Sequence, residues 1–327
     1  MKKILKKRFF ITGGAGFIGS NLCEYLTAHN NFVTVYDNFS NDKDINLKNI
    51  LNTSNLNIIK ADVRDTKNLQ SSIQNHDYVI HLASNSDIAS SMSVPDIDFD
   101  NGIFLTKCVL EAMRKNNMKN IIFTSGSGVY GVVPDFPIPE NFSPLIPIST
   151  YGAQKLSSEN YLSAYSFMFD MNCIALRFSN VVGANQTHGV IHDFILKLFK
   201  NNSELQILGD GHQRKPFIHI LDIISAINLI INKMESSSIL FDVFNVASQD
   251  SITVKEIADL ICCEMGLSKV NYKYSGGTKG WKGDIPKYSL DTSKIRKLGW
   301  DNIKNSKEAA LDSIKCMILE IKKGNYK

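Results

Sequence analysis

Residues 12–19 read Thr-Gly-Gly-Ala-Gly-Phe-Ile-Gly, and this stretch decides the fold of the 327-residue chain. The apolar run at 9–12 predicts a β-strand, and residues 17–28 predict the helix that follows it. Glycines allow a tight turn close to a pyrophosphate, and the helix N-terminus directs unpaired N–H groups at that anion. The stretch therefore predicts a dinucleotide-binding turn, with contacts from Gly13, Gly16, Phe17, Ile18 and Gly19.

The next predicted strand, residues 32–36, is followed by Asp37, which lies 18 residues past Gly19. A carboxylate at this position accepts hydrogen bonds from the adenosine ribose and repels a 2′-phosphate. The residue after it is Asn38 and not arginine, so the sequence favours NAD over NADP as the cofactor.

Predicted strands and helices alternate through the first half of the chain. The strands are expected at 9–12, 32–36, 57–60, 78–82, 120–124 and 173–178, and the helices at 17–28, 103–115 and 150–169. This alternation predicts an α/β fold, a Rossmann-type doubly wound parallel sheet with helices on both faces.

The alternation becomes irregular after residue 180. Helices are expected at 192–199, 220–231, 253–265 and 307–322, a strand at 241–246, and a loop over 271–283. We expect an NAD-binding Rossmann domain over 1–180 and a smaller α/β C-terminal domain for the substrate over 181–327. The strand at 241–246 is able to return to the first sheet.

Composition and charge exclude several classes of protein. Apolar residues make up 43% and charged residues 21%, as in ordinary globular domains. Lys plus Arg number 36 against 32 acidic residues, and five of the basic ones are Lys2, Lys3, Lys6, Lys7 and Arg8. The excess is therefore N-terminal, and no nucleic-acid partner is expected.

Targeting and metal signals are also lacking in the sequence. The basic start is followed by too short an apolar run for a signal peptide, and no run reaches the ~18–20 residues that span a membrane. The six cysteines are scattered without a C-x-x-C pair. We expect free thiols in the cytoplasm, no membrane partner and no metal site.

Tyr151 and Lys155 stand at i and i+4 of the helix predicted over 150–169, so they share one face. A nearby ammonium, together with the positive ring of NAD⁺, favours the phenolate and makes Tyr151 a general base. A surface pair is the alternative interpretation. Of the 11 tyrosines, only Tyr151 is followed four residues later by lysine, which favours the catalytic interpretation.

Two strand ends supply further cofactor candidates. Asp62 and Val63 follow the third strand, near the expected adenine edge; the alternative for Asp62 is an acid at the start of a helix near Thr66. His81 ends the fourth strand and is interpreted as a structural histidine. The residues after it are expected to pass close to the cofactor, namely Leu82, Ala83 and Ser84.

Taken together, these motifs resemble the extended short-chain dehydrogenase/reductase superfamily, and within it the nucleotide-sugar epimerases and dehydratases. The resemblance covers nearly the whole chain. It rests on residues 12–22, 35–38, 62–63, 81–84, 129–131 (Val-Tyr-Gly), 151–155, 176–183 (LRFSNVVG), 208–222 (LGDGHQRKPFIHILD) and 282–288 (KGDIPKY).

The resemblance implies an NAD-dependent 4-epimerase of nucleotide sugars, active in carbohydrate metabolism such as polysaccharide biosynthesis. Tyr151 takes the proton of the sugar 4-hydroxyl while hydride leaves C4, and hydride then returns to the other face. Family members also pair the helices at 103–115 and 150–169 between subunits, which implies a homodimer. The implied site residues are Asn101 and Ser125 near cofactor and sugar, and Asn180, Arg214, Lys215, Lys282 and Asp284 on the nucleotide.

Some positions depart from the family pattern. Gly126 stands where many members have Ser or Thr beside the reacting oxygen, and Ser125 or Ser127 is the candidate replacement, with Ser127 favoured. Trp281 replaces a phosphate-binding arginine. Ser127 and Gly128 stand at positions where the related 4,6-dehydratases carry an Asp-Glu pair. Without these acids, elimination of water from the sugar has no group to move the proton. Tyr288, by its bulk near the sugar C2, favours glucose or galactose over N-acetyl sugars.

Two other functions remain open on the sequence. A net 4-dehydrogenase or 4-keto reductase would use the same Tyr151, Lys155 and NAD, and would differ only in releasing the keto sugar. A non-catalytic NAD-binding sensor is the third candidate, and Gly126 is the residue that favours it.

Overall fold

The structure is a computed structural model that describes residues 4–40, 44–85, 88–236 and 240–324. Lys2 and Lys3 of the basic N-terminus lie outside the described residues. The chain forms two compact units, and each is built from separate segments. The first comprises Met1–Tyr130, Leu145–Phe178 and Ile224–Phe244, and the second comprises Gly131–Pro144, Ser179–Ile223 and Asn245–Lys327.

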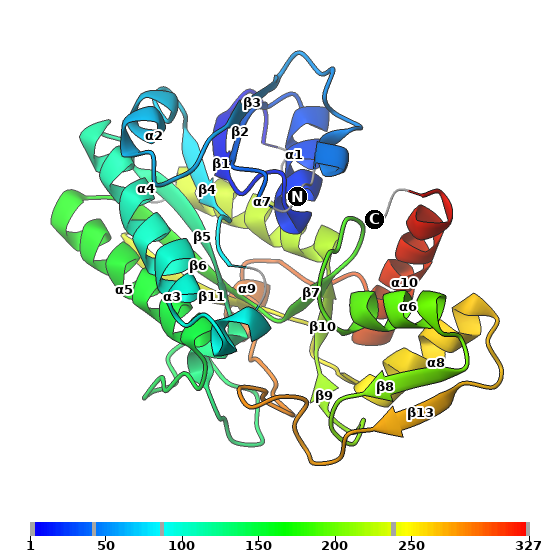
Figure 1. Cartoon of the computed structure of the whole chain (residues 1–327). Coiled ribbons are helices and arrows are strands. Elements are labelled where there is room, and N and C mark those ends of the chain that lie inside the picture. Colours follow the sequence, from blue (N-terminus) through cyan, green and yellow to red (C-terminus); the bar gives the residue numbers. More distant parts are fainter. Residues whose placement is uncertain (1–3, 41–43, 86–87, 237–239, 325–327) are drawn as a thin grey trace. The chain divides into compact units, whose positions relative to one another are not determined.

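A seven-stranded sheet organises the first unit, in the order β11-β6-β5-β4-β1-β2-β3 (Figure 1). Neighbouring strands from β1 to β6 are parallel. The order reverses beside β1, where a doubly wound sheet binds its ligand. The strands are β1 Arg8–Thr12, β2 Phe32–Asp37, β3 Leu56–Lys60, β4 Tyr78–His81, β5 Asn120–Gly126, β6 Asn172–Phe178 and β11 Phe241–Val246.

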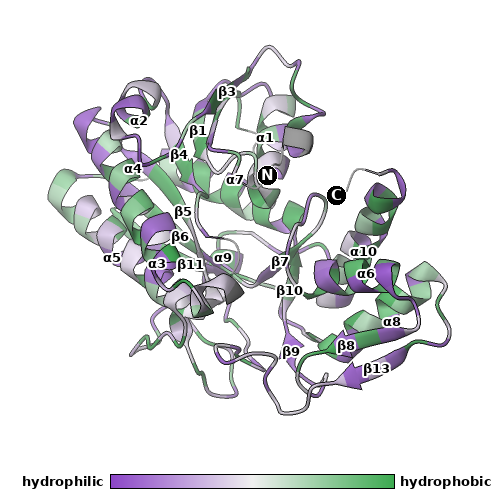
Figure 2. Ribbon diagram, in the orientation of Figure 1, coloured by the Kyte–Doolittle hydropathy of each residue, from purple (hydrophilic) through white to green (hydrophobic). Residues whose placement is uncertain are grey.

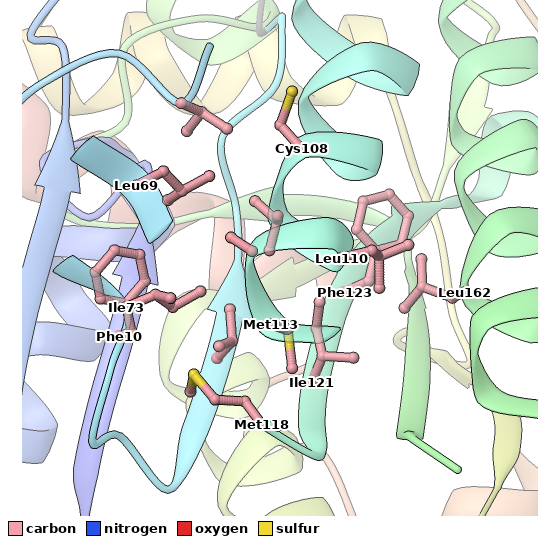
Figure 3. Packing of buried hydrophobic residues seen from close by; sticks show 14 of the residues in the cluster. Phe10, Leu69, Ile73, Cys108, Leu110, Met113, Met118, Ile121, Phe123 and Leu162 are labelled. Atoms are coloured by element: carbon pink, nitrogen blue, oxygen red, sulfur yellow. The ribbon is translucent and has the colours of Figure 1, made fainter. Parts of the chain in front are cut away.

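Helices cover both faces of this sheet, with α4 and α5 on one face and α1 and α7 on the other (Figure 1). They are α1 Phe17–Ala28, α2 Thr66–Ser72, α3 Asp96–Asp98, α4 Phe104–Lys115, α5 Thr150–Phe169 and α7 Ile220–Ser236. Side chains of the sheet and of α2, α4 and α5 interlock in a buried core that includes Phe10, Met113, Ile121 and Leu162 (Figure 3). Hydrophobic residues are concentrated on the central strands and on α7 (Figure 2).

The second unit combines short strands with amphipathic helices. Its strands pair as β7 with β10 and β8 with β13, both parallel, and β9 with β12, which is antiparallel. They are β7 Asn180–Val182, β8 Glu204–Ile207, β9 Arg214–Lys215, β10 Phe217–His219, β12 Ile252–Thr253 and β13 Asn271–Tyr274. The helices are α6 Val190–Lys200, α8 Val254–Met265, α9 Ser293–Arg296 and α10 Ser306–Lys322. A separate core centres on Phe194, Ile257 and Ile314.

The structure confirms the predicted fold class and the return of residues 241–246 to the first sheet as β11. The expected loop over 271–283 is wrong at its start, because residues 271–274 form β13 against β8. Most side chains of β13 are exposed, so this strand carries no apolar alternation for sequence reasoning to detect.

In the described chain, no helix has both the length and the apolar character needed to cross a membrane.

Candidate active site

The turn between β1 and α1 is built of closely packed backbone. Gly13 has φ +70°, and a Cβ on it would lie 2.7 Å from the backbone nitrogen of Ala83. A Cβ on Gly19 would lie 2.4 Å from the Gly13 carbonyl oxygen, so neither position accepts a side chain. Gly16 is the N-cap of α1, and no side chain of the described residues caps this helix start. Its first N–H groups are therefore available to an anion.

Asp37 ends β2 beside this turn. Its carboxylate accepts hydrogen bonds from the backbone N–H of Ala15 (3.0 Å) and of Phe39 (2.8 Å), which fixes its orientation. Burial raises its pKa, and the two N–H donors oppose that rise. Because a carboxylate has about four lone-pair sites, capacity remains for ribose hydroxyls.

Asp62 lies next to Asn38, whose amide donates to its carboxylate at 3.1 Å. The Arg64 guanidinium binds the same carboxylate at 2.7 and 2.8 Å, and these bonds hold the pKa of Asp62 well below its usual range. Helix α2 begins at Thr66, and its N-cap is Asp65. Val63 is buried in the core of the first unit.

His81 is a structural histidine, as expected. It is 1% exposed, and its ring nitrogens bond to the hydroxyls of Thr12 (2.7 Å) and Thr106 (3.2 Å). Burial, with a smaller contribution from the Lys155 charge, lowers the pKa of His81 to about 3. The imidazole is therefore neutral. The chain continues through Leu82–Ser84, where the backbone of Ala83 abuts Gly13.

Tyr151 and Lys155 lie in the first turns of α5, which begins after the N-cap Ser149. Gly152 makes this start possible, because a Cβ there would lie 2.4 Å from the carbonyl oxygen of Gly128. The Lys155 ammonium donates to the Thr124 carbonyl at 2.9 Å and lies 5.6 Å from the centroid of the Tyr151 ring. The structure thus brings the predicted pair together at the carboxyl end of β5.

The charges around this pair differ from the expectation. Burial, and then the Asp98 carboxylate, raise the pKa of Tyr151 to about 12. Burial lowers the pKa of Lys155 to about 8, against the influence of Asp98 and Glu159. Burial and the Asp98 charge are not visible in the spacing of Tyr151 and Lys155. By itself the chain keeps Tyr151 as a neutral phenol.

Position 126 faces the phenol. A Cβ on Gly126 would lie 3.9 Å from the Tyr151 hydroxyl oxygen, at ordinary contact distance. Ser125 points elsewhere, because its hydroxyl donates to Glu159 at 2.5 Å and Glu159 forms a buried ion pair with Arg177 at 2.6 Å. The structure therefore does not bring Ser125 to Tyr151. Ser127 begins the 3-10 turn Ser127–Tyr130, and its role stays a prediction.

Asn101 lies in an irregular helical turn, Phe99–Ile103, with φ −101° and ψ 17°. Its backbone carbonyl accepts from the N–H of Asn85 at 3.1 Å. A contact of its side chain with the cofactor stays a prediction.

Three of the residues expected to bind the nucleotide, together with Tyr288, form two bonded pairs in the second unit. Asn180 donates to the hydroxyl of Tyr288 at 3.2 Å, and Lys215 forms an ion pair with the buried Asp284. Asp284 also accepts from the N–H of Gly280 at 2.9 Å.

The side chains of Arg214 and Lys215, neighbours on β9, have different partners. Arg214 contacts Ser251 at 3.3 Å and Glu256 at 3.7 Å, because successive side chains of a strand point to opposite faces. The structure does not combine Arg214 and Lys215 in one cluster. Lys282 is exposed, and the Trp281 ring packs on Gly283, where a Cβ would lie 2.3 Å from it.

Residues 9–247 match the family described as NAD dependent epimerase/dehydratase. The chain belongs to this family. Its cofactor is NAD, which fits the glycine turn and Asp37, and it is an enzyme of the extended short-chain dehydrogenase/reductase type.

Proteins similar in sequence to this epimerase/dehydratase family member are named UDP-glucose 4-epimerases. This chain is 33% identical over 300 residues to a protein of Methanocaldococcus jannaschii that is provisionally named a UDP-glucose 4-epimerase. The match covers 89% of this chain and 92% of the relative. The chain is 30% identical over 226 residues to the UDP-glucose 4-epimerase of Mycolicibacterium smegmatis, covering 67% of this chain and 71% of the relative.

Solved structures agree with the same fold. A crystal structure of a UDP-galactose 4-epimerase has a TM-score of 0.86 and 31% identity, covering 96% of this chain and 99% of that one. The UDP-N-acetylglucosamine 4-epimerase of Methanobrevibacter ruminantium has a TM-score of 0.85 and 32% identity, covering 97% of this chain and 100% of that one.

Sequence reasoning missed three charged residues that shape the site: Arg64, Glu159 and Asp98. Glu159 was detectable, since it repeats the four-residue spacing of Tyr151 and Lys155 on one helix face. Asp98 offered no such signal, because it belongs to an acidic stretch in which Asp96 is exposed and Asp98 is buried.

Proposed function

We propose that this enzyme is a 4-epimerase of nucleotide-linked hexoses, and that a UDP-hexose is its substrate. The observation that supports this most directly is the Tyr151–Lys155 pair at the carboxyl end of β5, in the unit that carries the NAD-binding turn. A proton acceptor beside a hydride acceptor is what oxidation of an alcohol at a sugar carbon requires.

The residues divide the reaction between them. NAD, when bound, supplies the hydride acceptor and later the hydride donor. With NAD bound, Tyr151 would act as the phenolate: it accepts the proton of the 4-hydroxyl as that carbon is oxidised, and it returns the proton when the other epimer forms. Lys155, buried and bonded to Thr124, places a positive charge by the ring and so favours the phenolate that accepts the proton.

Two observations support epimerisation over loss of water. The turn Ser127–Tyr130 contains no carboxylate that could move a proton between neighbouring carbons. The similar solved structures named above are described as 4-epimerases of UDP-sugars. In the second unit, the Lys215–Asp284 and Asn180–Tyr288 pairs supply the kinds of group that bind a diphosphate and a ribose.

The first experiment offers purified protein, with no cofactor added, a panel of UDP-, dTDP-, GDP- and CDP-sugars. Products are separated by chromatography with mass detection. A new peak of unchanged mass supports the 4-epimerase and identifies its sugar. A product lighter by two hydrogens, with reduced cofactor on the protein, supports a 4-dehydrogenase, and loss of water supports a dehydratase.

The variant Tyr151→Phe tests the catalytic assignment. It keeps the ring and removes the hydroxyl, so turnover should fall by about 100-fold or more while bound NAD is retained. Tyr161→Phe is the matched control, because Tyr161 lies on the same helix and is 43% exposed. Full activity of Tyr151→Phe, or equal loss in both variants, contradicts the assignment.

We also propose that the protein is a homodimer in a reducing compartment such as the cytoplasm. The exposed apolar side chains Phe104 of α4, and Phe167 and Met168 of α5, support a subunit contact through these helices. The six cysteines, all in the described part of the chain, are free thiols. Light scattering on the double variant Phe167→Glu/Met168→Glu should show a monomer where the parent protein shows a dimer.

A further inference from the structure

A buried carboxylate outside the predicted site connects three of its segments. Asp98, the last residue of α3, is 1% exposed. Its Oδ2 accepts the hydroxyl of Thr150 at 2.6 Å, and its Oδ1 accepts the side-chain amide of Asn85 at 2.9 Å. One carboxylate therefore bonds to the residue before Tyr151 and to the residue after Ser84.

Further contacts join the same three segments of the chain. Gln154, one helical turn after Thr150, donates to the hydroxyl of Ser84 at 3.1 Å. The backbone N–H of Asn85 donates to the carbonyl of Asn101 at 3.1 Å. A Cβ on Gly102 would lie 2.3 Å from the Gln154 amide oxygen, so that side chain fills the space beside the turn. We call the set Ser84, Asn85, Asp98, Thr150 and Gln154 the latch.

We propose that Asp98 is a positioning residue, whose buried carboxylate fixes the first turn of α5 against the chain after β4 and so sets Tyr151 relative to the cofactor-lining residues. This proposal rests on the 4-epimerase function proposed above. It assigns Asp98 no contact with substrate or cofactor. Misplacement of a reacting group by about 1 Å costs on the order of 100-fold in rate, so such a latch has kinetic consequences.

The charge of Asp98 adds a second effect. In the described chain, the other ionisable groups around Tyr151 and Lys155 are His81 from β4 and Glu159 from α5. His81 is neutral, and Glu159 is paired with Arg177 from β6. Asp98 accepts its hydrogen bonds from two neutral groups, Asn85 and Thr150, and its negative charge opposes the phenolate.

Two variants separate these effects. Asp98→Asn removes the charge and keeps the size, and the amide of Asn85 can turn to preserve hydrogen bonding. Thr150→Val removes only the hydroxyl, and Thr150→Ser restores it. Asp96→Asn is the matched control, because Asp96 lies on the same short helix and is exposed.

The expected results are specific to each variant. Thr150→Val lowers kcat by about 10-fold with little change in the sugar KM, and Thr150→Ser recovers most of it. Asp98→Asn lowers kcat similarly and also shifts the acid limb of the pH–rate profile to lower pH, because the phenolate loses a neighbouring anion. A merely structural role would lower the plateau without moving the limb. Asp96→Asn resembles the parent protein.

Hydrogen–deuterium exchange provides a readout that does not depend on turnover. Thr150→Val should speed exchange in residues 82–85 and 96–103, across Asp98 from the mutated side chain, and Asp96→Asn should not. Unchanged exchange there, or an unmoved acid limb in Asp98→Asn, overturns the proposal. If the parent protein turns over no sugar, the 4-epimerase function fails, and the exchange data still decide the latch.

Discussion

Position 126 offers a test of how Tyr151 receives its proton. A Cβ placed on Gly126 would lie 3.9 Å from the Tyr151 hydroxyl oxygen and 3.9 Å from the carbonyl oxygen of Phe178, so the variant Gly126→Ser fits without a clash. Its Oγ, one bond further out, can come within the roughly 2.5–3.0 Å of an O–H···O hydrogen bond to the phenol. Because Tyr151 takes the proton directly from the sugar oxygen, the added hydroxyl would also be within reach of that oxygen, and it would donate a hydrogen bond to it as negative charge develops.

The size of the effect follows from hydrogen-bond energies. A hydrogen bond to a charged group contributes about 1.5–3 kcal/mol, and each 1.36 kcal/mol removed from a barrier is tenfold in rate. Part of that energy is already present in the bound alcohol, before negative charge develops on the sugar oxygen. We expect Gly126→Ser to raise the rate of the oxidation step by about 10-fold.

The assay is a single turnover that follows absorbance of reduced nicotinamide on the protein. This signal reports the oxidation step even where product release limits kcat. Gly126→Ala is the control, because it fills the same space without a hydroxyl. If Gly126→Ser is no faster than Gly126→Ala, the reasoning from this geometry is refuted, and Tyr151 works without a hydroxyl partner at that position.

Three further predictions concern the cofactor site and the core. Asp37→Ala should lower the preference for NAD over NADP by about 10-fold or more, measured by calorimetric titration of each, because the repulsion of a 2′-phosphate is lost; an unchanged preference contradicts the assignment. Glu159→Ala should lower the free energy of unfolding by about 3–5 kcal/mol in urea, because it leaves Arg177 buried without its partner, whereas removal of both charges in Glu159→Leu/Arg177→Met should cost much less. The stability of the parent protein should fall as pH decreases from about 6.5 toward 3, because His81, with its pKa lowered to about 3, binds a proton more readily when unfolded. His81→Gln should flatten that part of the curve, and two parallel curves would contradict the buried neutral imidazole.

Sequence reasoning succeeded where local pattern determines structure. The bounds of α1 and α5 match the predicted 17–28 and 150–169. The glycine turn marks the start of α1, and the N-cap Ser149 marks the start of α5. Glycine spacing predicted the phosphate turn, and four-residue spacing predicted the Tyr151–Lys155 pair.

The features that the sequence did not predict depend on contacts between segments that are distant along the chain. No local pattern shows that Ser125 bonds to Glu159 while Gly126 faces the phenol, since neighbours on a strand differ only by which face they occupy. Asp98 acquires its role from Asn85 and Thr150, which are 13 and 52 residues away. The pKa of Tyr151 likewise depends on burial, which spacing does not reveal.

The segmented build of the first unit has a consequence for biosynthesis. A ribosome releases the chain from the N-terminus, and β11 pairs with β6 only after residue 246 has emerged. Until then β6 is paired only with β5 and has one open edge, and a chain that ends before α7 lacks the apolar residues with which this helix covers the sheet. A nascent chain stalled near residue 180 is therefore expected to aggregate or to bind chaperones, although it already holds the complete glycine turn and α5.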